Sequence, residues 1–175
     1  MDALTPSEIS TTWIENLAIE EINMEESGVI NINEHLDPVH RLEESSIELM
    51  EKIKELFEIY VTRFNELRTD KDSAKQIKIF KISNTVNDFM LFRNSLKLVV
   101  ARRSPEVITI GFLSNSGGLF AARLNFEEGS STRVHEIKAS VGAFNNIQWR
   151  FHGELVEIDS LVKHHLTEFI RHTAR

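Results

Sequence analysis

The chain has 175 residues, of which 41% are hydrophobic and 27% charged, a composition that predicts one globular core with an appended segment. It contains no cysteine, which excludes disulfides, thiolate metal sites and cysteine nucleophiles. The net charge of −7 is unevenly divided, because residues 1–70 hold 17 acidic and 5 basic side chains and residues 71–175 hold 10 and 15. This division indicates two parts with different partners, or two parts that face each other.

The N-terminal sequence MDALTPSEIS lacks the basic and apolar regions of a secretory signal. No apolar stretch approaches the roughly 18 residues that a membrane-spanning helix needs. We therefore expect a soluble, cytoplasmic protein that has no membrane partner.

The first segment, residues 1–35, is acidic and has a narrow apolar stripe. Trp13, Ile14 and Leu17 would share one face of a helix whose other positions are rich in glutamate. Such a segment either docks on a partner as a helix or stays disordered until it does so. We take these three apolar side chains as candidate anchors for a protein partner.

The second segment, residues 36–70, is predicted to be a single long amphipathic helix. Asp37 and Pro38 suit the N-cap and first helical positions, and apolar residues recur from Leu42 to Leu67 in steps of mostly three or four. About 30 helical residues extend for about 45 Å, which is long for a domain of this size. This length predicts pairing with another helix, either the N-terminal segment or a second copy in a homodimer.

The third segment, residues 71–175, has short strand-like runs joined by turns, which predicts an antiparallel meander of about five strands. The run QIKIFKI has apolar residues and lysine on both faces, so the pattern does not decide which face points inward. Residues 83–95 fit either a short helix or a strand. With residues 36–175 as one folded unit, the class is α+β. The expected inward positions are Leu96, Leu98, Ile108, Ile110, Phe112, Ile137, Ala139, Val141, Ile147, Trp149 and Phe151.

The chain closes with an expected helix whose apolar stripe packs across the sheet. Its members are Leu161, Val162, Leu166, Phe169 and Ile170.

The glycine-containing run LSNSGGLF lies between two expected strands. It lacks the strand-to-helix setting of a phosphate loop or a nucleophile elbow, so we interpret Ser114 to Gly118 as a hairpin turn.

His164, Glu168 and His172 follow one another at four-residue steps along one face of this closing helix. Two imidazoles and a carboxylate at that spacing are candidate metal ligands. The same spacing describes any solvated helix face, and no further ligand is securely placed to complete a coordination shell. We therefore assign no metal, and we expect His165 to pack beside or at the rim of the apolar stripe.

Five basic residues are expected on, or near, outward positions of successive strands. They are Lys97, Arg103, Arg123, Lys138 and Arg150. Such a stripe would bind an anionic partner, whereas the simpler interpretation is the solvated outer face of a one-sided sheet. Sheets that bind nucleic acid usually expose aromatic rings, and the strand aromatics here are expected to point inward. An acidic protein segment, including the chain's own N-terminus, is therefore the favoured partner.

No catalytic arrangement is recognisable in the sequence, and we expect neither enzymatic activity nor a cofactor. We predict a homodimeric protein-interaction or adaptor module that uses the acidic N-terminal segment and the basic sheet face. The alternative is a nucleic-acid-associated protein whose acidic segment is autoinhibitory. A second alternative is an α+β cradle for a small molecule.

Overall fold

The computed structural model describes residues 9–28, 38–68, 75–114 and 134–174. Contacts divide the chain into residues 1–37 and residues 38–175, and each unit is described by itself. The first unit contains α1 (Thr12–Ser27), a helix in which no residue is buried. Gly28 ends α1 in the left-handed conformation with φ of 67°, and its N–H donates to the carbonyl of Met24. Glycine takes this conformation without a Cβ clash.

The second unit has an antiparallel sheet of seven described strands in which each strand pairs with the next in sequence. The strands are β1 (Lys78–Lys81), β2 (Phe89–Arg93), β3 (Leu96–Ser104), β4 (Val107–Ser114), β5 (His135–Val141), β6 (Ile147–Phe151) and β7 (Glu154–Leu155). The β2–β3 and β6–β7 turns place two successive residues at positive φ, which matches the twist of an antiparallel hairpin. The predicted α+β class with an antiparallel meander and a closing helix is confirmed, with seven strands in place of about five.

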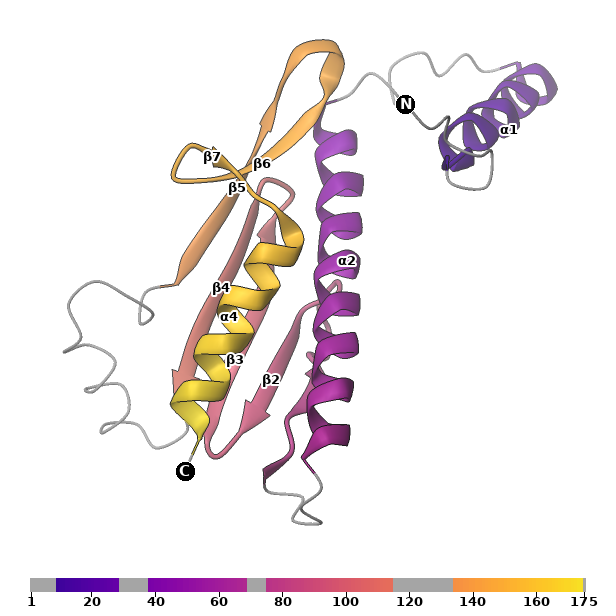
Figure 1. The fold of residues 1–175 in the computed structure, drawn as a ribbon. Coiled ribbons are helices and arrows are strands. Elements are labelled where there is room, and N and C mark those ends of the chain that lie inside the picture. Colours follow the sequence, from indigo (N-terminus) through magenta and orange to yellow (C-terminus); the bar gives the residue numbers. More distant parts are fainter. Residues whose placement is uncertain (1–8, 29–37, 69–74, 115–133, 175) are drawn as a thin grey trace, which may run out of the picture. The chain divides into compact units, whose positions relative to one another are not determined.

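Two helices, α2 (Pro38–Leu67) and α4 (Ile158–Thr173), pack against the same face of this sheet (Figure 1). The core between helices and sheet is a single cluster. Its fully buried large side chains are Phe57, Phe89, Phe169, Met50, Ile53, Leu91, Leu96, Leu98, Ile108, Ile110, Ile137 and Val100. The sheet residues of this set alternate along their strands, so the opposite face of the sheet is left outside the core.

The long helix α2 uses its apolar stripe inside its own unit. Met50, Ile53 and Phe57 are fully buried against the sheet and α4, and Leu67 at the end of the helix is 65% exposed. Ser46, a polar residue of α2, is also fully buried, and its hydroxyl accepts a hydrogen bond from Arg102 Nη1 at 3.2 Å. The length of α2 is therefore explained by its packing along a wide sheet and α4. It gives no separate reason to expect pairing with a second long helix.

The two regions that the sequence left ambiguous, residues 76–82 and 83–95, contribute β1 and β2. Ile79 pairs with Leu91 on the core side, and Phe80 pairs with Met90 on the opposite side. Both strands are apolar on both faces, which explains why alternation alone did not fix their orientation. The interpretation of residues 83–95 as a possible helix was therefore wrong.

The predicted inward positions lie on the core face of their strands, and all of them except Val141 are at least partly buried. Val141 is 46% exposed because it ends β5, next to the turn formed by η2 (Ala143–Asn145). The hairpin expected at Ser114 to Gly118, and the strand expected after it, fall largely outside the described residues. Within the described sheet, β4 pairs directly with β5.

Candidate functional site

The face of the sheet opposite the helices carries most of the basic residues predicted there. Lys138 and Arg150 are cross-strand partners on this face, and Lys97 pairs with Leu113. Arg103 lies at a β-bulge and its Nε donates to Thr109 Oγ1 at 3.3 Å, which also places it on this side. Arg123 lies outside the described residues. We call this surface the outer face.

Among the residues that the structure describes, the guanidinium and ammonium groups of the outer face have few local counter-charges. Lys138 Nζ lies 3.5 Å from Glu136 Oε2, and both side chains are exposed. Arg150 donates to the carbonyl of Gly153 at 2.8 Å and to Gln148 Oε1 at 2.7 Å, which are neutral acceptors. The arrangement therefore leaves a positive potential on the outer face, and such exposed charges act mainly through partner selection and encounter rate.

The outer face also has an apolar row that the sequence did not predict. Strand pairing and the contact of Val134 with Gly111 align five residues across the sheet: Phe80, Met90, Val99, Gly111 and Val134. Phe80 is 44% exposed and Val134 is 55% exposed, and Met90 and Val99 between them are half-buried, so a partly exposed apolar row crosses a basic surface. Added to Lys78 and Phe92, which pair with each other, this row distinguishes the outer face from a simple solvated sheet.

The helix α1 presents the predicted anchor residues to solvent. Trp13, Ile14 and Leu17 are 67%, 43% and 40% exposed. The helix contains five glutamates and no lysine or arginine. Its surface is therefore acidic and apolar at once, and an isolated helix of 16 residues is marginal in water without a partner.

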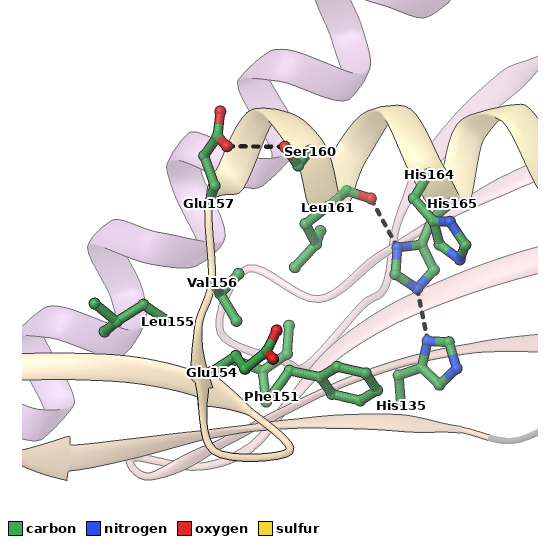
Figure 2. Close-up of a pocket in the computed structure, with 11 residues that line it drawn as sticks. His135, Phe151, Glu154, Leu155, Val156, Glu157, Ser160, Leu161, His164 and His165 are labelled. Carbon is green, nitrogen blue, oxygen red and sulfur yellow. Dashed lines mark hydrogen bonds between the residues drawn. The ribbon is translucent and has the colours of Figure 1, made fainter.

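Two histidines of α4, His164 and His165, gather with a strand histidine that the sequence analysis missed. His135, the first residue of β5, donates or accepts through Nδ1 to His165 Nε2 at 3.0 Å, and its ring stacks near that of His164 (Figure 2). His165 is buried, and its Nδ1 lies 2.7 Å from the carbonyl oxygen of Leu161. His135 has the same strand parity as Ile137, so its inward direction was available from the alternation of β5.

The Leu161 carbonyl fixes the protonation pattern of this chain of imidazoles. A carbonyl only accepts, so the neutral His165 ring carries its proton on Nδ1 and presents the lone pair of Nε2. His135 must then donate from Nδ1, which leaves its own Nε2 as an acceptor. Burial lowers the pKa of His165 to about 4, with smaller contributions from His135 and His164, so the ring is neutral at pH 7.

The three predicted metal-ligand candidates do not converge. His164 Nε2 lies 3.9 Å from Glu168 Oε1, whereas the ring of His172 packs edge-on against Phe112 with 6.0 Å between centroids. Within the described part of the chain, no group of three or more His, Asp or Glu side chains is arranged to hold a metal ion. Equal helical spacing therefore did not translate into a shared coordination point.

No protein-family model, curated protein or solved structure matches the chain, so function is argued from the surfaces above. Among the described residues, no helix is both long enough and apolar enough to cross a membrane.

Proposed function

We propose that the chain is a non-enzymatic protein-interaction module whose outer face binds an acidic, apolar helix. The observation that carries this proposal is the combination of an apolar row with basic side chains on one exposed sheet face. Protein interfaces that are not obligate have an apolar centre and a polar rim, and this arrangement matches both parts.

The chain itself contains a segment with the complementary chemistry. The helix α1 has exposed apolar residues and only negative charge, while the outer face has exposed apolar residues and a predominance of positive charge. Opposite potentials select partners and orient them during encounter. We propose that the partner is α1 of a second copy, which makes the module a homodimer.

Nucleic acid is the alternative partner for a basic sheet with exposed aromatic rings. Phe80 and Phe92 lie on the outer face, so the described part of the sheet offers two rings that could stack on bases. Their neighbours Met90, Val99 and Leu113 are aliphatic, however, and such side chains suit an apolar helix better than stacked bases. This composition favours a protein ligand.

The proposal is tested by sedimentation velocity of the full chain over a wide range of concentrations. We expect a concentration-dependent dimer that is weakened about tenfold or more by the pair Lys97→Glu and Arg103→Glu. The reciprocal pair Glu21→Lys and Glu25→Lys should weaken it as well, and combining all four changes should restore much of the affinity.

The matched control is the pair Lys52→Glu and Arg63→Glu, which makes the same charge change on an exposed face of α2. A chain that stays monomeric at all concentrations would contradict the proposal, as would control and test pairs with equal effects on dimerisation.

Fluorescence anisotropy with labelled single-stranded RNA and DNA tests the alternative partner, nucleic acid. Binding that falls steeply with salt and is lost in the Lys97→Glu, Arg103→Glu pair would support nucleic acid instead.

A further inference from the structure

A pocket of about 320 Å³ lies between the first turns of α4 and the strands β5, β6 and β7, away from the outer face (Figure 2). It is lined by His135, Ile137, Phe151, Glu154, Leu155, Val156, Glu157, Ser160, Leu161, His164 and His165. This volume is at the lower end of the range for small-molecule sites.

The walls of the pocket are mainly apolar and partly open to solvent. Phe151 supplies an aromatic ring, and Val156, which packs against the core, forms part of the lining. The side chain of Leu155, the cross-strand partner of Arg150, points away from Phe151 (Figure 2). Leu161 and Ile137 close the deep side as members of the core. A ligand with an apolar or aromatic body would cover Phe151 and Val156 and remove their surface from water.

In their neutral form, His165 and His135 offer the pocket no free N–H donor. Both nitrogens of His165 are occupied, by the Leu161 carbonyl and by His135. The hydrogen bond from His135 Nδ1 leaves its Nε2 as an acceptor. His164 Nε2 lies 3.9 Å from Glu168 Oε1.

Apart from the histidines, the charged side chains of the lining are all acidic among the residues that the structure describes. Glu154 and Glu157 both line the pocket, and none of the described lysines or arginines does so. Ser160 donates its hydroxyl to Glu157 Oε2 at 2.9 Å, so this hydroxyl is also occupied. Glu157 and Asp159 stand at the start of α4 and offset the positive end of the helix dipole, which would otherwise favour an anion.

From this lining, we infer that the pocket binds a small organic cation, an amine attached to an apolar or aromatic body. The body packs on Phe151 and Val156, and the ammonium lies toward the carboxylate of Glu154, the cross-strand partner of Phe151. The carboxylate of Glu157 is turned toward Ser160 instead (Figure 2). Aromatic rings also attract cations at their faces, which gives Phe151 a second role. This site is separate from the outer face, and it does not depend on dimerisation.

The inference is tested with two probes of the same size, 2-phenylethylamine and phenylacetate, titrated into the full chain at pH 7.5. Histidine imidazole resonances in two-dimensional NMR report binding next to His135 and His164. We expect the amine to bind at least tenfold more tightly than the carboxylate. Equal or tighter binding of phenylacetate, or no binding of either probe, would overturn the inference.

Three variants locate the probe. Glu154→Gln removes one pocket charge with little change in shape and should weaken amine binding several-fold, since exposed charge pairs contribute about 1 kcal/mol or less. Glu136→Gln makes the same change on the outer face and should have no effect. Ser160→Trp places a large ring at the exposed edge of the pocket and should abolish binding; undiminished binding would show that the amine sits elsewhere.

Discussion

The indole Nε1 of Trp149 on β6 donates a hydrogen bond to the hydroxyl of Ser45 on α2, at 3.0 Å and across 104 positions of sequence. This contact attaches the N-terminal half of the long helix to the last part of the meander. Both residues are partly buried, so water competes incompletely for the indole N–H.

Replacing Ser45 with alanine should lower the free energy of unfolding by about 0.5–1 kcal/mol. The loss of an acceptor costs about 1 kcal/mol, and alanine recovers part of this through its higher helix propensity. Urea unfolding measures the change, and Thr62→Ala on an exposed position of α2 is the control that isolates propensity. In a Trp13→Phe background, fluorescence then reports on Trp149 alone, and an unchanged emission spectrum in Ser45→Ala would argue against the contact.

The buried imidazole of His165 predicts lower stability in acid. Its folded pKa of about 4 lies below the ordinary value of 6.5, so the unfolded chain binds more protons between these two pH values. Stability is therefore complete above about pH 6.5 and decreases as the pH falls toward 4. We expect the loss between pH 7.5 and pH 5 to be about 2 kcal/mol from this residue.

The measurement is urea unfolding at both pH values for the original chain and for His165→Gln. The groups that act on His165 are His135, His164 and the Leu161 carbonyl, and burial also lowers the pKa of His135, so some pH dependence should persist in the variant. His172→Gln serves as the control, because His172 packs against Phe112 outside this cluster. Equal pH dependence in all three proteins would disprove the assignment.

The ring pair Phe57 and Phe89 joins α2 to β2 in the centre of the core. Both residues are fully buried, and their rings meet edge-on with 5.8 Å between centroids. Phe89→Ala should cost about 3–5 kcal/mol through lost burial and the cavity that remains. Phe80→Ala, one strand away on the outer face and 44% exposed, should cost much less, and denaturant unfolding of the two variants makes the comparison. Similar losses would contradict the assigned faces of β1 and β2.

Phe144 at the tip of the β5–β6 hairpin is fully exposed and has φ of 55° and ψ of 34°. Left-handed backbone is unfavourable for most residues and tolerable for asparagine. Phe144→Asn should therefore be more stable than Phe144→Ala by about 0.5–1 kcal/mol in thermal or urea unfolding. If alanine proved equal to asparagine, the strain would be absent from this turn.

The sequence predicted the helices of the second unit well because each has a long, continuous apolar stripe. The segment predicted at residues 36–70 corresponds to α2, and the stripe from Leu161 to Ile170 lies within α4. The outer face was harder to predict, because Ile79 and Phe80 are both apolar and only pairing with β2 shows which of them faces solvent. A single strand with two apolar faces does not contain that information.

The histidine chain was beyond sequence analysis for a different reason. His135 and His165 are 30 residues apart, and their contact requires both the strand parity of β5 and the rotation of α4 over the sheet. The four-residue spacing within α4 emphasised His164 and His172 instead, although His172 turns toward Phe112. Local periodicity places residues on one element, whereas a site between elements depends on their packing.

The borders of the meander limit how copies of this chain could associate. In the described sheet the outermost strands are β1, with four residues, and β7, with two. Lysines occupy both ends of β1, and charged, short border strands discourage the addition of a further strand from another molecule. Continuous sheets and strand-exchanged fibres are therefore disfavoured, and contact through side chains on a sheet face is the more accessible route to assembly.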